Sequence, residues 1–314
     1  MCDDDTEIEN AIYLRKAGLT RRELGLGTAA TVASLLSGCK PGATATASTD
    51  APPPTEPTPT SPDAVPPTTT PHAEMVTIET SDGVAEAFFV APTSGRHPAV
   101  LIWPDIAGLR PSFTAMATRL AAQGYAVLAV NHYYRNAKMP VLESFEQWRT
   151  PEGKAKITPA REALTNEAIT RDAAAFVAWL DRQPQVDTAR KVGTTGYCMG
   201  GPFTLRTAAA VPARVGVIGS FHGGGLVTAD ADSPHRLLAS TKTAALICIA
   251  QNDDEREPES KTTLRESADA AGLFAEIEVY PAQHGWCVTD SPVYDETQAE
   301  RAWSRLLAML SSKT

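Results

Sequence analysis

Hydrophobic residues in most of this chain are gathered into short uninterrupted runs. Such runs occupy residues 98–103, 125–130, 215–221 and 244–250. An uninterrupted apolar strand leaves no face for water, so these runs predict strands buried on both faces, as in a parallel sheet. Two shorter runs, at 75–80 and 86–90, are joined by Ser-Asp-Gly and predict an antiparallel hairpin at the sheet edge.

Between these runs, apolar residues recur at every third or fourth position, which is typical of amphipathic helices. The predicted helices cover residues 111–123, 162–182, 199–211, 259–271 and 295–310. A charged stretch at 136–160 shows no such period and is interpreted as an irregular insertion. The alternation of strand and helix predicts an α/β fold with a mostly parallel, doubly wound sheet and helices on both faces.

The composition changes along the chain and divides it into three parts. Residues 1–39 have the pattern of a targeting segment, because Arg21 and Arg22 precede an uncharged apolar run at 26–36 that is too short to span a bilayer. This order resembles a twin-arginine export signal. The run ends in Leu-Ser-Gly-Cys39, which resembles a lipobox. We therefore expect an exported bacterial protein, periplasmic and anchored to the membrane through a lipidated Cys39; the alternative is an amphipathic N-terminal helix.

Residues 40–73 are rich in Pro, Thr and Ala and predict a disordered linker, because they hold too few large apolar side chains to offset the entropy of ordering. Residues 74–314 are long enough for one domain with a sizeable core. The formal net charge is −9 and the domain has no basic cluster, which argues against a nucleic-acid partner. No metal-ligand spacing or nucleotide-binding glycine loop is present, so we expect neither a metal nor a cofactor.

The sequence Gly-Tyr-Cys-Met-Gly-Gly at residues 196–201 follows a β-branched run. A nucleophile flanked in this way by glycines sits on a sharp turn from strand to helix, where the side chain projects alone over the helix N-terminus. The helix dipole there favours a thiolate. The pattern therefore predicts Cys198 as a nucleophile, although a buried structural cysteine in the same turn is the alternative.

Two later strands end next to residues that complete a catalytic set. The strand at 244–250 is followed by Asp253 and Asp254, and the strand at 276–280 is followed by His284. The chain order nucleophile, acid, histidine is that of α/β-hydrolases. His284 would move the proton and an aspartate would orient its ring. Asp253 is favoured as that acid, and Asp254 stays open.

With its cysteine elbow and late His-Gly pair, the domain resembles the dienelactone hydrolase family of α/β-hydrolases. The resemblance covers approximately residues 75 to 310. It implies an oxyanion hole formed by the backbone N–H groups of Ile106 and Met199. It also implies that Asp105, an aspartate where the family usually has glutamate, helps to control ionisation of the nucleophile.

The same resemblance implies that Arg135 holds the carboxylate of an anionic substrate. A second arginine expected shortly after the histidine is absent here. Tyr197, His222 and Trp286 are candidates for the wall of the substrate pocket; for His222 a turn role is the alternative, and Tyr197 and Trp286 can also pack beneath the pocket. Of the remaining cysteines, Cys248 is expected in the core and Cys287 in a loop, from which it could also resolve an oxidised nucleophile.

Two functions remain at this point. The first is hydrolysis of a small-molecule ester or lactone through a triad of Cys198, Asp253 and His284 and an acyl-thioenzyme intermediate. The second is a non-hydrolytic or redox-sensing lipoprotein in which Cys198 acts as a thiol switch on a retained hydrolase scaffold.

Overall fold

The computed structural model describes residues 4–16 and 71–314. These described residues belong to one compact unit. The predicted export signal, the lipobox at Cys39 and nearly all of the predicted linker lie outside the described residues. Among the helices that are described, none is both long enough and apolar enough to cross a membrane.

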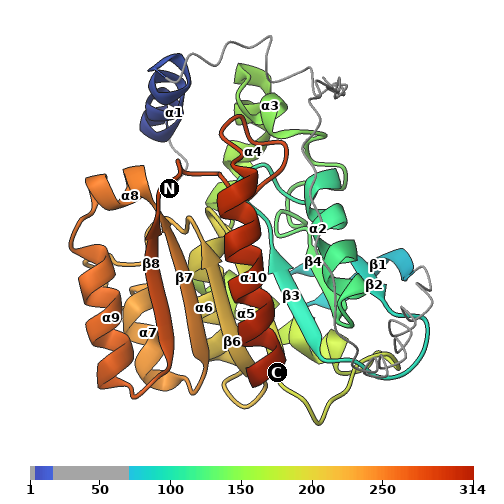
Figure 1. The fold of residues 1–314 in the computed structure, drawn as a ribbon. Coiled ribbons are helices and arrows are strands. Elements are labelled where there is room, and N and C mark those ends of the chain that lie inside the picture. Colours follow the sequence, from blue (N-terminus) through green and yellow to red (C-terminus); the bar gives the residue numbers. More distant parts are fainter. Residues whose placement is uncertain (1–3, 17–70) are drawn as a thin grey trace, which may run out of the picture. The chain divides into compact units, whose positions relative to one another are not determined.

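One sheet of eight strands runs through the domain in the order β1-β2-β4-β3-β5-β6-β7-β8 (Figure 1). The β1–β2 and β2–β4 pairs are antiparallel and all other pairs are parallel. This arrangement matches the predicted doubly wound sheet with its edge hairpin. The strands are β1 (His72–Thr80), β2 (Gly83–Ala91), β3 (Ala99–Trp103), β4 (Ala126–Val130), β5 (Val192–Tyr197), β6 (Val215–Phe221), β7 (Ala244–Ala250) and β8 (Ala275–Tyr280).

Helices cover both faces of the sheet (Figure 1). The helices α2 (Pro111–Ala122) and α10 (Glu296–Lys313) pack on one face. The other face carries α5 (Asn166–Leu180), α6 (Gly200–Ala210) and α9 (Ser260–Ala270). Every residue of β3, β4, β5 and β6 is buried. The uninterrupted apolar runs therefore form the centre of the sheet, where neither face meets water.

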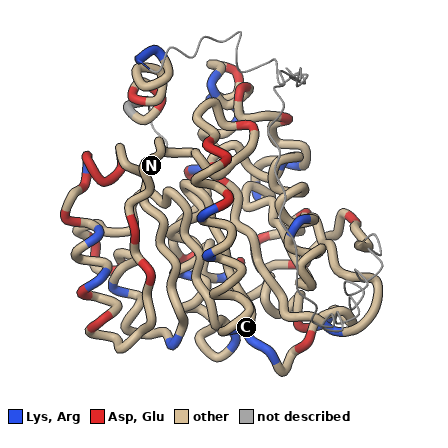
Figure 2. Tube along the Cα trace, in the orientation of Figure 1, with Lys and Arg blue, Asp and Glu red and all other residues tan. Residues whose placement is uncertain are grey.

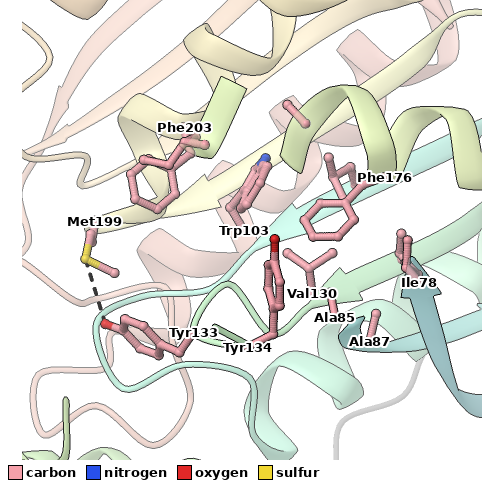
Figure 3. Packing of buried hydrophobic residues seen from close by; sticks show 14 of the residues in the cluster. Ile78, Ala85, Ala87, Trp103, Val130, Tyr133, Tyr134, Phe176, Met199 and Phe203 are labelled. Carbon is pink, nitrogen blue, oxygen red and sulfur yellow. Dashed lines mark hydrogen bonds between the residues drawn. The ribbon is translucent and has the colours of Figure 1, made fainter. Parts of the chain in front are cut away.

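Aromatic side chains fill the face of the sheet that supports α5 and α6. The ring of Trp103 lies 5.6 Å from the rings of both Phe176 and Phe203, centroid to centroid. Figure 3 shows these three rings between the sheet and the two helices. The Trp103 indole N–H donates to the hydroxyl of Thr207 at 3.0 Å, so its polar atom is satisfied inside the core.

The segment at 136–160 is not irregular as predicted, because most of it forms α3 (Phe145–Trp148) and α4 (Pro151–Glu162). The hydroxyls of Ser144 and Thr150 cap these helices by accepting backbone N–H groups. The predicted helix at 162–182 begins instead at Asn166, where Thr165 is the cap. Short polar helices depend on such caps more than on apolar periodicity, so the periodic pattern missed them.

Three further elements were not predicted. They are α7 (Pro234–Leu237), the short 3-10 helix η1 (Leu238–Ser240) and α8 (Gln251–Arg256). The helix α1 (Asp4–Lys16) lies in the segment for which an N-terminal helix was the alternative to a targeting signal. Strand β1 also begins two residues earlier than the predicted domain boundary at 74. In the view of Figure 2, acidic and basic residues are interspersed along the described chain.

Candidate active site

Cys198 lies in a strained turn between β5 and α6. Its backbone φ is 52°, a left-handed conformation that non-glycine residues rarely adopt. A side chain at Gly196 would collide with the carbonyl of Gly200, and one at Gly200 would collide with the carbonyl of Trp103. The glycines are therefore required for strand and helix to approach this closely, and the turn presents the Cys198 side chain at the carboxyl end of β5.

Asp253 and His284 meet at the neighbouring strand ends. The Asp253 carboxylate lies 2.7 Å from Nδ1 of His284, in a contact where the imidazole N–H donates to the carboxylate. Asp253 belongs to α8, which follows β7, and His284 follows β8. The adjacent Asp254 instead accepts both its contacts, at 2.7 Å, from the ammonium group of Lys261. The geometry thus distinguishes between the two aspartates that the sequence left open.

The charges around His284 favour its protonated form. Burial opposes a charge on the ring, but the Asp253 carboxylate and the Cys198 thiolate outweigh this and raise the pKa of His284 to about 10. Cys198 and His284 are 1% and 2% exposed. In such an enclosed setting an imidazolium between two anions is strongly stabilised, and the arrangement favours a thiolate–imidazolium pair.

The backbone of His284 is also fixed. Its N–H donates to Oδ1 of Asn252 at 2.8 Å. Asn252 is buried and directly precedes Asp253 on α8. The same short helix therefore holds the histidine by its backbone and by its ring. The sequence analysis did not single out Asn252. The signal available for it was its position directly before the predicted acid, Asp253.

A buried arginine connects Asp105 to the loop after His284. The Arg110 guanidinium donates to both oxygens of Asp105, at 2.6 and 2.9 Å, and to both oxygens of Asp290, at 2.8 Å each. Burial raises the pKa of Asp105 despite the attraction of Arg110. Asp290 behaves oppositely: burial acts to raise its pKa, but the contacts with Arg110 lower it overall.

Neither Arg110 nor Asp290 was predicted. The signal in the sequence was an arginine in the same short loop as Asp105, but its second partner lies 180 positions away. Because the Cys198 thiolate also raises the pKa of Asp105, the aspartate is electrostatically coupled to Cys198. Both Asp105 oxygens are nevertheless held by Arg110.

Ile106 lies in the loop after β3, and Met199 directly follows Cys198 and precedes α6. Within residues 71–314, neither N–H donates to another group of the protein. The Tyr133 hydroxyl donates to the Ile106 carbonyl at 2.8 Å and also contacts the Met199 sulfur at 3.8 Å. Figure 3 shows Tyr133 reaching toward Met199. Tyr133 therefore ties the two segments together.

His222 lies directly against Cys198. Its φ is 40°, and its Nδ1 accepts the backbone N–H of Cys198 at 3.1 Å. Burial and the charge on His284 lower its pKa well below the ordinary value, so the ring is neutral. Its ring lies 4.9 Å from the His284 ring and 5.1 Å from the Trp286 ring, centroid to centroid. His222 supports the turn and borders the site.

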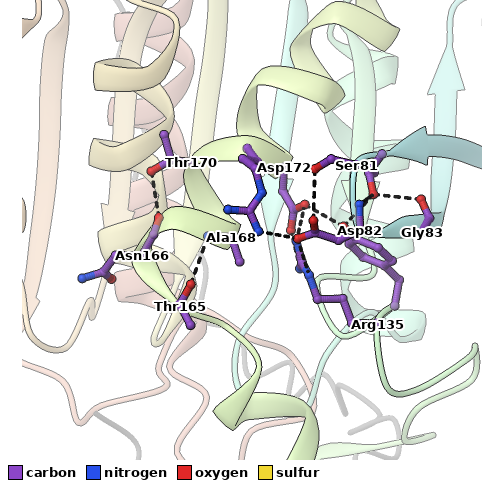
Figure 4. Close-up of polar contacts among 12 residues, drawn as sticks. Ser81, Asp82, Gly83, Arg135, Thr165, Asn166, Ala168, Thr170 and Asp172 are labelled. Carbon is purple, nitrogen blue, oxygen red and sulfur yellow. Dashed lines mark hydrogen bonds and ion pairs between the residues drawn. The ribbon is translucent and has the colours of Figure 1, made fainter.

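Arg135 is not available for a substrate carboxylate, which corrects the expectation from the family resemblance. All three of its guanidinium nitrogens donate to Asp82 or Asp172, at 2.6 to 3.0 Å (Figure 4). The guanidinium carbon also lies 4.6 Å from the Tyr134 ring centroid. The arginine neutralises two carboxylates between the edge hairpin and α5, and Asp172 is 1% exposed.

Tyr197 and Trp286 pack beneath the site rather than forming its wall. Tyr197 stacks on Phe221 at 5.0 Å, and Trp286 is fully buried and stacks on Tyr280 at 5.3 Å. A cavity of about 140 Å³ lies between α2 and α10, and its lining includes Tyr197 and Cys287 but none of Cys198, Asp253 and His284.

Cys248 and Cys287 are both buried without a disulfide. Across the part of the chain that is described, no three His, Cys, Asp or Glu side chains are grouped as metal ligands.

Comparisons with known proteins identify the family of this chain. The model of the dienelactone hydrolase family matches residues 85–313. A Methylorubrum extorquens protein that bears the provisional name carboxymethylenebutenolidase is 29% identical over 236 residues, covering 74% of this chain and 78% of that protein. The carboxymethylenebutenolidase of a Pseudomonas species is 25% identical over 219 residues, covering 70% of this chain and 86% of the relative.

A solved structure with the same fold supports the assignment. The Klebsiella pneumoniae protein provisionally named dienelactone hydrolase superposes with a TM-score of 0.63 at 22% identity, over 77% of this chain and 99% of its own. At this identity the likeness shows the α/β-hydrolase fold alone. With the family model spanning nearly the whole domain, this chain belongs to the dienelactone hydrolase family and is a lactone or ester hydrolase.

Proposed function

We propose that the protein hydrolyses esters or lactones through a triad of Cys198, His284 and Asp253. The observation that carries the proposal is the 2.7 Å contact between Asp253 and His284, together with the rise in the pKa of His284 caused by Asp253 and the Cys198 thiolate. A carboxylate that orients an imidazole next to a strained, buried cysteine is the arrangement required for nucleophilic catalysis.

In the first step, the Cys198 thiolate attacks the acyl carbon and the carbonyl oxygen becomes an oxyanion. The N–H groups of Ile106 and Met199, which donate to no described group, are proposed to bind that oxygen. As the C–O bond to the leaving alcohol breaks, the His284 imidazolium donates its Nε2 proton to the departing oxygen. The products are an acyl-thioenzyme and the alcohol; for a lactone the alcohol remains part of the same acyl group.

In the second step, neutral His284 removes a proton from water, and the resulting hydroxide attacks the thioester. The C–S bond breaks, the carboxylic acid leaves, and the thiolate–imidazolium pair is restored. Asp253 stays ionised throughout and stabilises the imidazolium whenever it forms. Asp105 is proposed to influence the nucleophile through its charge, while Arg110 keeps it in position.

The substrate is proposed to be a small ester or lactone that needs no carboxylate for binding. Arg135 is committed to Asp82 and Asp172, and Arg110 is committed to Asp105 and Asp290. The loop after His284 continues as Gly-Trp-Cys-Val-Thr and supplies no arginine. An anionic dienelactone would therefore meet no unpaired guanidinium from these positions.

The test is hydrolysis of neutral aryl esters, neutral lactones and an anionic dienelactone by the full chain. Cys198→Ala is the informative variant, and Cys287→Ala is the matched control, because it removes another buried thiol that does not interact with His284. We expect loss of at least about a thousandfold in kcat/KM for the first variant and near wild-type rates for the second. Equal rates for wild type and Cys198→Ala would refute the thiol mechanism.

Absence of hydrolysis in every protein, combined with rapid oxidation of Cys198 by peroxide, would refute the proposal in another way. That outcome would favour the thiol switch.

A further inference from the structure

The N-terminal helix α1 contacts the rest of the compact unit through polar residues. Thr6 and Asn10, four positions apart and so on one face of the helix, are 1% and 5% exposed. Its large apolar residues show the opposite pattern, since Ile8, Ile12 and Tyr13 are 56%, 45% and 42% exposed. A helix held by non-specific apolar adhesion would bury these three side chains instead. Directed polar contacts therefore determine how α1 is bound.

Two acidic residues of α1 pair with basic residues from separate elements. Glu7 accepts a hydrogen bond from Nε of Arg149 at 2.7 Å, and this pair is partly buried, with 15% and 25% of the side chains exposed. Glu9 accepts from Arg256 at 2.6 Å. Arg149 follows α3, in the segment between β4 and α5, and Arg256 ends α8. The helix thus connects elements whose charges complement its own.

Further contacts lead from α1 directly to His284. The side-chain amide of Asn10 donates to the backbone carbonyl of His284 at 3.0 Å. Glu9 also accepts from Nδ2 of Asn252 at 3.0 Å, while Oδ1 of Asn252 accepts the His284 N–H. Both backbone groups of the histidine are therefore linked to α1, one directly and one through Asn252.

We propose that Arg149, Asn252, Arg256 and the His284 backbone form a binding surface for an acidic helix. Its occupant is α1 of the same chain before any cleavage at Cys39, and the bound helix covers the active site and limits access to Cys198. The inference rests on the proposed function, because that proposal makes Cys198 the nucleophile. Charge complementarity at two ion pairs, and burial of polar rather than apolar helix residues, support this occupant.

The test compares full-length variants by two independent measurements. The first is the rate at which iodoacetamide alkylates Cys198, followed by peptide mass spectrometry, which needs no hydrolysis. The second is kcat/KM for a neutral aryl ester. Glu7→Arg and Glu9→Arg each place a like charge against an arginine, and we expect each to raise both quantities about fivefold or more.

Two further variants separate release of the helix from general damage. Exchanging the charges in Glu7→Arg/Arg149→Glu rebuilds the ion pair and should return both quantities toward wild type. Glu300→Arg is the matched control, because Glu300 pairs with Arg119 and neither residue contacts α1. Glu300→Arg should leave the alkylation rate and kcat/KM unchanged. Sodium chloride at about 1 M should raise the wild-type rates and narrow their difference from Glu7→Arg, because salt screens these pairs.

The outcomes distinguish failure of this proposal from failure of the proposed function. Faster alkylation in the reversed variants without hydrolysis in any protein would support the cover and refute the hydrolytic mechanism. Hydrolysis in all proteins, with neither quantity changed by Glu7→Arg or Glu9→Arg, would overturn the cover alone. Lack of recovery in the charge exchange would likewise overturn it.

Discussion

Replacing Asp253 by asparagine tests which aspartate orients His284. The change removes a charge 2.7 Å from Nδ1 of the imidazole but keeps the size of the side chain. Asp254→Asn is the matched control, because it makes the same chemical change at the adjacent position, where the carboxylate contacts Lys261 instead.

The expected magnitude follows from the charges around the ring. The rise in the pKa of His284 from 6.5 to about 10 corresponds to roughly 5 kcal/mol of net stabilisation of the imidazolium, at about 1.4 kcal/mol per pH unit. Asp253 is the larger of its two favourable charges. Loss of this charge, together with loss of ring orientation, predicts a kcat/KM lower by about 10²–10⁴-fold.

The assay is steady-state hydrolysis of a neutral aryl ester from pH 5 to 10 for wild type and both variants. Asp253→Asn should also lower the pKa of His284, which can be followed by NMR of the ring. Asp254→Asn should stay within about threefold of wild type. An equal loss in both variants, or a loss below about threefold in Asp253→Asn, would refute the assignment of Asp253.

Three further predictions concern charges that the site depends on. Arg135→Met should lower the free energy of unfolding in urea by about 3 kcal/mol, because Asp172 stays buried without its guanidinium partner. The KM for a neutral ester should change less than twofold. A large rise in KM would mean that Arg135 binds substrate. Arg110→Met should cost about 3–5 kcal/mol in the same measurement because Asp105 loses its guanidinium, and a change under about 1 kcal/mol would contradict the structure. The stabilisation supplied by protonated His284 should be complete below about pH 6.5 and disappear as the pH rises toward 10, since its folded pKa lies above the unfolded value. The measurement is the difference in unfolding free energy between wild type and His284→Gln. If this difference does not shrink over this pH range, His284 is not charged.

The sequence by itself determined the sheet and the positions of the chemistry along it. Uninterrupted apolar runs can be satisfied only by burial on both faces, so the central strands and the parallel arrangement followed directly. The glycines at 196 and 200 marked the strained turn because no side chain fits there. Cys198 and His284 could be singled out because parallel strands bring their carboxyl ends to one edge of the sheet.

Only the tertiary structure decided which charged groups meet. The sequence favoured Asp253 but left Asp254 open, and the start of α8 turns the first of them toward His284. Arg135 has the position of a substrate-binding arginine, but two distant aspartates engage all three of its guanidinium nitrogens. Partners separated by many residues leave no periodic signal, because a single ion pair depends on how the loops fold and not on any local pattern. The same reason hid Arg110 with Asp290 and the contact between α1 and His284.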